Sequence, residues 1–243
     1  MADWQKFLEE VDQRLVSLDT SGCNDPFFRG HADAVWKLRP TLARQQANPR
    51  FNDAKEARLF WEFRMSGSHL LPAGCSNWTV LYFMQHFGLP TRLLDWTTSF
   101  AHALFFALRE PAAISPTVFI MNPYELNSLN PNGSRSVANL NVVFQQDYST
   151  LLTSGKWPRG ALAVAGDASI ERVRHQKGAF TVHGGLTDDI EQMYSSAITK
   201  HVLPSDAKGD AENFIRLAGV DEFTIYPDLD GLARSISRRE LGL

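Results

Sequence analysis

The stretch from Leu81 to Arg109 combines polar and apolar residues in a way that suggests chemistry. Gln85 and His86 lie inside one apolar segment, and Arg92 and Asp95 lie inside the next one. Polar side chains that are buried among so much apolar surface cost free energy unless they find partners. These residues therefore either pair with one another inside the protein or face a ligand.

Arg92 and Asp95 are expected to point in opposite directions. They lie three positions apart in Thr91–Trp96, a short strand-like run, and successive side chains of a strand alternate between its two faces. One of the two would then face Arg29 or a ligand, and the other would face the protein scaffold. The alternative is a structural pair between them, with His86 hydrogen-bonded in the core.

A second candidate lies upstream, where Arg29 follows two phenylalanines and precedes Gly30. The planar guanidinium of arginine suits a bidentate contact with a phosphate or a carboxylate. A glycine beside it would let a ligand approach the backbone closely. A salt bridge from Arg29 to Asp95 is the structural alternative.

Two buried arginines without partners are too costly for one core, and few acids accompany them: Asp33 near Arg29, and Asp95 near Arg92. We therefore expect Arg29 and Arg92 to line one shared, partly solvated cleft. A dianionic ligand such as a pyrophosphate would balance the two cations. The walls of this cleft are expected to include His86, Thr97 and Gln176.

The composition is that of an ordinary globular protein. The chain has 243 residues, of which 44% are hydrophobic and 21% charged, enough for one sizeable core. Its formal net charge of -3 excludes the overall basic field of non-specific DNA binding, but it allows a local basic patch.

Cys23 and Cys75 show no metal-ligand spacing, so no metal site is expected. No signal peptide or membrane span is evident, which predicts a cytoplasmic protein with free thiols.

Apolar periodicity and turn residues predict a mixture of helices and strands. We expect helices at 1–19, 51–69, 100–108 and 206–218, and a short helix after the turn at 227–231. Strands are expected at 27–31, 91–96, 117–121, 140–144, 161–165, 198–203 and 223–226, with two more on either side of a turn near Gly178. The segment Asn122–Ser136 is rich in Asn, Pro, Ser and Gly, which indicates a mobile loop.

Several blocks of the sequence resemble the FRG domain family, which is named for a Phe-Arg-Gly motif. These blocks are FFRG, WKLRPTLAR, QHFGLPTRLLDWTTSFAHALFFA, RHQKGAFTVHGG and YPDLDGLA. They occur in the family's order between Phe27 and Ala233. We therefore expect a single FRG-type domain over 1–243, with its motif core at 27–233 and an N-terminal helix at 1–19.

The layout also resembles, more faintly, that of mono-ADP-ribosyltransferases. Those enzymes begin their catalytic core with an aromatic-Arg-Gly strand. A second strand ends in hydroxyl residues before an Ala- and Phe-rich helix, and an acid or a Gln precedes a Gly-x-Phe strand. The matching residues are Phe28–Gly30, Asp95–Ser99 with Ala101–Ala107, and Gln176 ahead of Gly178 and Phe180. This resemblance implies an α+β fold with a split, mostly antiparallel sheet core and flanking helices.

One departure from that layout concerns the catalytic acid. No Glu-x-Glu or Gln-x-Glu pair stands where those enzymes keep their catalytic Glu. Gln176 cannot ionise, so at the site it would orient a hydroxyl and not accept a proton. Asp228 and Asp230 could supply an acid, or they could simply cap the last helix.

The resemblance implies an enzyme that transfers ADP-ribose from NAD to a nucleic acid or a protein, in a toxin or phage-defence setting. NAD would be the co-substrate. The candidate catalytic residues are Gln176, Glu171 and His86. The candidate NAD-binding residues are Arg29, Gly30, Arg92, Asp95, Trp96, Thr97 and Phe100. Two alternatives stay open: a non-catalytic nucleotide or nucleic-acid binding module, and a phosphodiester-cleaving enzyme that uses His86 or His175 with an acid.

Overall fold

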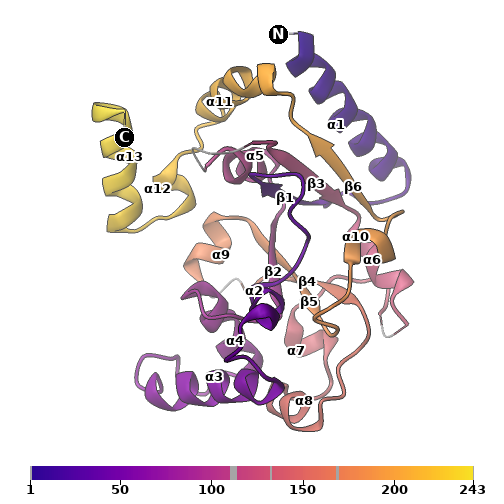
Figure 1. Ribbon diagram of the computed structural model, residues 1–243, viewed down its shortest axis with the longest axis vertical. Coiled ribbons are helices and arrows are strands. Elements are labelled where there is room, and N and C mark those ends of the chain that lie inside the picture. The colour runs from indigo at the N-terminus through magenta and orange to yellow at the C-terminus, as the bar shows by residue number, and fades with distance from the viewer. Residues whose placement is uncertain (1, 110–113, 132, 168–169, 243) are drawn as a thin grey trace.

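The computed structural model describes residues 2–109, 114–131, 133–167 and 170–242 (Figure 1). Within these ranges the chain forms an α+β fold around a six-stranded antiparallel sheet of order β4-β5-β2-β1-β3-β6. The strands are β1 (Phe27–His31), β2 (Leu93–Thr97), β3 (Thr117–Met121), β4 (Ala161–Ala165), β5 (Gly178–His183) and β6 (Ile198–Val202). The predicted antiparallel sheet with flanking helices is therefore confirmed.

The sheet is almost divided at its centre. β1, β3 and β6 pair along their lengths, and so do β2, β5 and β4. Among the described residues, one pair joins the two halves: Phe28 of β1 stands opposite Thr97 of β2. The predicted split sheet thus takes the form of two three-stranded halves that meet at this pair.

Each half of the sheet has its own helices and its own apolar cluster. The helices beside β1, β3 and β6 are α1 (Ala2–Thr20), α5 (Phe100–Leu108) and α11 (Lys208–Leu217). The helices beside the other half are α3 (Asp53–Ser66), α4 (Asn77–His86) and α8 (Tyr148–Ser154). In Figure 1 the first group lies at the top of the molecule and the second at the bottom. A third apolar cluster, which includes Phe27 of β1, Trp96 of β2 and Ala163 of β4, spans both halves.

Helix α5 packs directly against β1 at Gly30. A Cβ atom at position 30 would stand 1.9 Å from the carbonyl oxygen of Ala103 and 2.6 Å from the backbone nitrogen of Ala107. Such short contacts would force the helix away from the strand. The sequence suggests that Gly30 lets a ligand approach the backbone, but the structure gives this space to α5.

Three predicted strands are wrong because local capping favours helices there. The segments are α7 (Leu140–Val143), α9 (Glu171–His175) and α12 (Glu222–Ile225). The side chain of Asn139 accepts a hydrogen bond from the backbone of Val142, and Asp221 forms a capping box with Thr224, two devices that favour a helix start. After α9, Lys177 adopts a positive φ of 47° and turns the chain into β5.

The predicted mobile loop at Asn122–Ser136 is wrong for its first part, and the described residues that follow Leu129 in this segment form neither helix nor strand. Its first part is helix α6 (Pro123–Leu129), capped by Asn122. The buried side chain of Asn127 accepts from the backbone nitrogen of Ala163 at 2.7 Å and donates to the carbonyl oxygens of Ala163 and Ser136. The Asn residues that suggest a loop instead hold this segment against β4, and Asn132 lies outside the described residues.

The remaining elements complete the fold. They are α2 (Thr41–Arg44), α10 (Ile190–Met193), α13 (Leu229–Leu241) and two short 3-10 helices, η1 (Gln45–Ala47) and η2 (Ser205–Ala207). Asp228 caps α13 by accepting from the backbone nitrogen of Gly231 at 2.7 Å, which matches the structural alternative for that acid. Met1, the first residue of the predicted N-terminal helix, lies outside the described residues. No helix in the described ranges is both long and apolar enough to span a membrane.

Candidate functional site

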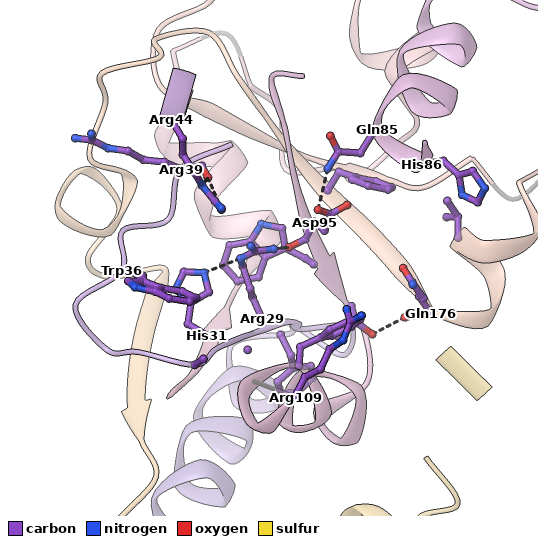
Figure 2. A pocket seen from close by; sticks show the side chains of 18 of the residues that line it. Arg29, His31, Trp36, Arg39, Arg44, Gln85, His86, Asp95, Arg109 and Gln176 are labelled. Atoms are coloured by element: carbon purple, nitrogen blue, oxygen red, sulfur yellow. Dashed lines mark hydrogen bonds between the residues drawn. The ribbon is translucent and has the colours of Figure 1, made fainter. Parts of the chain in front are cut away.

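A cavity of about 610 Å³ lies where the two halves of the sheet meet (Figure 2). Residues of β1 and β2 form part of its wall, together with the end of α4 and the segment 36–44. Basic and aromatic side chains dominate its lining. The lining includes Arg29, His31, Trp36, Lys37, Arg39, Arg44, Gln85, His86, Asp95, Trp96, Thr97, Phe106, Arg109, Gln176 and Tyr226.

Arg29 extends from β1 into this cavity. Its Nε donates to Nε2 of His31 at 2.9 Å, and its Nη1 donates to the carbonyl oxygen of Asp95. Burial lowers the pKa of Arg29 to about 10, although the nearby Asp95 raises it, so the guanidinium stays charged at neutral pH. The predicted alternative, a salt bridge to the Asp95 carboxylate, does not form among the described residues.

His31 accepts the hydrogen bond from Arg29 and must therefore be neutral at Nε2. Burial, and then the charge of Arg29, lowers the pKa of His31 to about 3. Sequence reasoning misses this residue, although the alternation of side chains along a strand places positions 29 and 31 on one face. Arg29 is thus positioned by two neutral acceptors, and its charge remains available to an anion.

Asp95 carries the carboxylate of the cavity wall. Its Oδ2 accepts from Nε2 of Gln85 at 2.8 Å. Thr91 fixes the orientation of this amide, because its hydroxyl donates to Oε1 of Gln85 at 2.5 Å while it accepts from the backbone nitrogen of Leu93 at 3.0 Å. A chain of hydrogen bonds therefore aims Asp95 from β2 into the exposed cavity.

Arg39 and Arg44 come from the segment between β1 and α3. Arg44 donates from Nε and Nη2 to the carbonyl oxygen of Arg39, at 3.2 and 3.1 Å. Lys37 is different, because its Nζ lies 3.0 Å from a carboxylate oxygen of Asp189. Trp36 is 45% exposed at the same wall. The sequence shows these basic residues but cannot show that the chain turns back over the cavity.

Arg109 stands at another part of the wall, just after α5. Its Nη1 donates to the hydroxyl oxygen of Tyr226 at 2.6 Å, and its guanidinium lies 5.0 Å from the centre of that ring. Arg234 of α13 lies 5.3 Å from the same ring. Arg109 closes the stretch that stands out in the sequence, but sequence reasoning assigns it no role.

Thr97 and Gln176 meet beside the cavity, as predicted. The hydroxyl of Thr97 donates to the carbonyl oxygen of Gln176 at 2.7 Å. The side chain of Gln176 donates from Nε2 to the carbonyl oxygen of Ile225 at 3.3 Å. Both residues thus connect β2 and the start of β5 at the point where the half-sheets meet, and His86 lies at the nearby end of α4 (Figure 2).

A comparison with protein families adds one observation to this geometry. Residues 24–115 match the model of the FRG domain family. This region is therefore similar to the FRG domain. The matched residues include Arg29, Asp95 and Arg109, and they end just before β3. No curated protein and no solved structure gives a significant match to the chain.

Arg92 does not share the cavity with Arg29, so that prediction is wrong. Its Nε and Nη2 lie 2.6 and 2.7 Å from the two carboxylate oxygens of Glu56. Its Nη1 donates to the carbonyl oxygens of His183 and Gly184, at 3.2 and 2.6 Å. The balancing acid comes from the distant helix α3, which the spacing of residues around Arg92 cannot reveal.

Two further predicted residues lie elsewhere. Glu171 is on α9 with a 69% exposed side chain, 3.8 Å from His175, and it is not part of the cavity wall. Phe100 packs against Phe28 and Phe214, with ring centres 6.0 and 5.9 Å apart. Gly30 lines the cavity with its backbone only. Within the described ranges of the chain, no group of three or more His, Cys, Asp or Glu residues could hold a metal ion.

Proposed function

We propose that the protein binds NAD in the central cavity and transfers its ADP-ribosyl group to a macromolecular acceptor. The observation that carries this proposal is the charge of the cavity wall. Arg29, Arg39, Arg44 and Arg109 line it without an ion pair to any described carboxylate, and Asp95 faces them. Such a wall, with aromatic rings between the cations, suits a ligand that combines a diphosphate with aromatic bases.

The diphosphate of NAD would lie against Arg29, Arg39 and Arg44. Arginine presents a planar set of donors that matches phosphate oxygens. Arg29 has the most fixed geometry of the three, because His31 and the Asp95 carbonyl hold it on β1. Trp36, partly exposed at the same wall, would offer a face on which a base can stack.

Asp95 would serve the transfer step. The bond between ribose C1′ and the nicotinamide nitrogen breaks, and its electron pair leaves with neutral nicotinamide. A nucleophilic atom of the acceptor gives an electron pair to C1′ and passes its proton to Asp95. The positive charge that develops on the ribose is stabilised by a fixed carboxylate, and Gln85 with Thr91 provides the fixing.

The convergence of three sequence blocks supports this assignment. The Arg29 strand, the hydroxyl end of β2 and the Gln176 turn are the parts that resemble mono-ADP-ribosyltransferases. Thr97 stands opposite both Phe28 of β1 and Gly178 of β5, so these blocks adjoin one another at the cavity. Asp95 replaces Glu171 as the candidate acid, because Glu171 is outside the wall.

A non-catalytic nucleotide-binding module is the second candidate. The observation that favours it is the amide of Gln176, which occupies the position before β5 and cannot ionise. For the phosphodiester-cleaving alternative, His86 lines the cavity, whereas His175 lies outside the cavity wall on α9 beside Glu171. A cytoplasmic location and a toxin or phage-defence role stay predictions.

Nicotinamide release from NAD, together with ADP-ribose binding by calorimetry, tests the proposal. Wild-type protein should bind ADP-ribose and release nicotinamide. Asp95→Asn should keep ADP-ribose binding but lower the release rate by about 100-fold or more, the size expected for one electrostatic catalytic group. Glu171→Gln is the matched control and should behave like the wild type.

The possible failures separate the two candidates. Binding of ADP-ribose without nicotinamide release, with or without added protein and nucleic acid, would establish the non-catalytic module. Absence of ADP-ribose binding would overturn both the NAD site and the transfer reaction. A loss of activity in Glu171→Gln that Asp95→Asn does not share would remove Asp95 from its role.

A further inference from the structure

We infer that the acceptor is a single-stranded polynucleotide and that Arg109 binds one of its phosphates. This inference rests on the proposed NAD site and identifies the chemical class of the acceptor. The surplus of positive charge in the cavity, the placement of its cations and the rings beside Arg109 point to this acceptor.

The surplus follows from the charges on the wall. Lys37 is neutralised by Asp189, which leaves the guanidinium groups of Arg29, Arg39, Arg44 and Arg109 facing the carboxylate of Asp95. The diphosphate of NAD would neutralise only part of this charge, and the nicotinamide ring brings a positive charge of its own. An anionic acceptor fits the remaining field, whereas a lysine or arginine side chain would be repelled.

The cations are also arranged in two places. Figure 2 shows Arg39 and Arg44 on one side of Arg29 and Arg109 on the other. A diphosphate is compact, so one that lies against Arg39 and Arg44 leaves Arg109 for another group. Asp95, which would face the reacting ribose, is on the wall between them. An acceptor phosphate at Arg109 would therefore place the acceptor beside the ribose on the side away from the diphosphate.

Aromatic rings beside Arg109 favour a polynucleotide over a simple phosphate. Phe106 is a partly exposed ring of the cavity wall, one helical turn before Arg109, whereas the Tyr226 ring is buried and supports the Arg109 guanidinium that lies over it. Cations that follow a phosphate backbone, interleaved with rings that stack on unpaired bases, are typical of single-strand binding sites. A base taken from a single strand also needs no unpairing before it enters a cavity.

Helix α13 continues this surface away from the cavity. Arg234 lies over the Tyr226 ring and forms no ion pair with a carboxylate among the described residues. Arg238, one turn further, is instead paired with Glu222 at 3.0 Å. A strand that leaves the cavity past Tyr226 would meet Arg234 first. Substitutions of these two arginines of α13 can therefore test whether a bound strand follows this surface, with Arg238 as the control for Arg234.

Binding of a fluorescent 12-nucleotide single-stranded DNA provides the test, with and without saturating ADP-ribose and at several salt concentrations. Arg109→Gln should weaken DNA binding by about tenfold or more, as expected for one charged contact. It should also lower the slope of log K against log salt by about 0.7, the value for one phosphate on a single strand. Arg234→Gln should weaken binding by a smaller factor, and the control Arg238→Gln should leave it unchanged.

ADP-ribose binding by the same variants separates this inference from the proposed function. Arg44→Gln should weaken ADP-ribose binding more than Arg109→Gln, whereas Arg109→Gln should weaken DNA binding more than Arg44→Gln. An Arg109→Gln variant that loses ADP-ribose as strongly as Arg44→Gln would overturn the acceptor assignment and leave the NAD site intact. A wild-type protein that binds DNA through Arg109 but not ADP-ribose would reject the NAD site alone. Equal DNA binding by wild type and Arg109→Gln would overturn the inference with or without ADP-ribose.

Discussion

Arg29 and Arg92 look alike in the sequence, but they occupy opposite kinds of environment. Each lies in an apolar run, Arg29 within β1 and Arg92 directly before β2. Arg92 is 7% exposed, and Glu56 binds it through both carboxylate oxygens. Arg29 is less buried and contacts only neutral acceptors, the imidazole of His31 and the main-chain oxygen of Asp95.

This difference indicates that Arg92 has a structural role and that Arg29 is available to a ligand. The donors of Arg92 are taken up by Glu56, two carbonyl oxygens and the overlying ring of Trp157, 4.1 Å from the guanidinium carbon. It joins α3 to the sheet and has nothing left for a ligand. Arg29 is oriented but not neutralised, which is the condition that an anion-binding residue needs.

Breaking the Arg92 pair should give the largest effect. Glu56→Ala leaves a buried guanidinium without its carboxylate and should lower the free energy of unfolding by about 3–5 kcal/mol. Urea denaturation would measure the change. Glu62→Ala, which removes an exposed acid from the same helix, is the control. Similar stabilities for the two variants would contradict a structural role for Arg92.

The corresponding change at Arg29 should spare the fold and damage binding. Arg29→Met removes a charged donor from the cavity and should weaken ADP-ribose binding by about 2–4 kcal/mol. Its free energy of unfolding should fall by far less than that of Glu56→Ala, because no carboxylate is left unpaired. Calorimetry and urea denaturation of Arg29→Met, with the exposed Arg58→Met as control, would measure both quantities. If Arg29→Met unfolds, Arg29 has a structural role like that of Arg92, and the proposed difference between the two arginines is wrong.

The two buried histidines near these arginines should produce a smaller, pH-dependent effect. Burial, with the nearby arginine charge, lowers the pKa of His31 to about 3 and that of His183 to about 3, whereas the unfolded chain has a histidine pKa of about 6.5. Between these values the unfolded state binds more protons. Stability is therefore fully present above about pH 6.5 and is lost as the pH falls toward 3, by about 1.4 kcal/mol per pH unit for each histidine.

Urea midpoints measured from pH 7 to pH 4 would test this prediction. His183→Gln should reduce the slope of the unfolding free energy against pH by about 1.4 kcal/mol per pH unit, which is the contribution of one proton. Replacement of the exposed His69 by Gln should leave that dependence as it is. An unchanged slope in His183→Gln would mean that His183 is protonated in the folded protein.

The sequence predicts the fold well where local pattern and tertiary packing agree. β3 and β4 are short apolar runs, and their bounds match the prediction. Leu140–Phe144 has an equally strand-like pattern, but the Asn139 cap and packing near Tyr82 and Leu162 make it helical. Propensity is a weak signal when tertiary contacts oppose it. The buried Asn127 is a similar case, because a loop-forming residue there binds the backbone of β4.

The candidate site is predictable only in part for a related reason. Polar residues in apolar runs identify Arg29, Asp95 and Thr97, which do line the cavity. Arg39 and Arg44 reach it because the chain turns back after β1, and no local pattern encodes that path. The partner of Arg92 is equally hidden, since Glu56 lies on a helix far away in the sequence.

The single pair between β1 and β2 has a consequence for the unit in which the protein folds. Residues 24–115 include β1 and β2, the strands that carry Arg29 and Asp95. The strands that pair with them along their lengths, β3 and β5, come later in the chain. A fragment limited to 24–115 would keep one sheet pair at its centre and leave two strand edges bare, which invites aggregation. During synthesis the cavity wall can be completed only after β5 has emerged. The boundary of the family match therefore does not coincide with that of an autonomous folding unit.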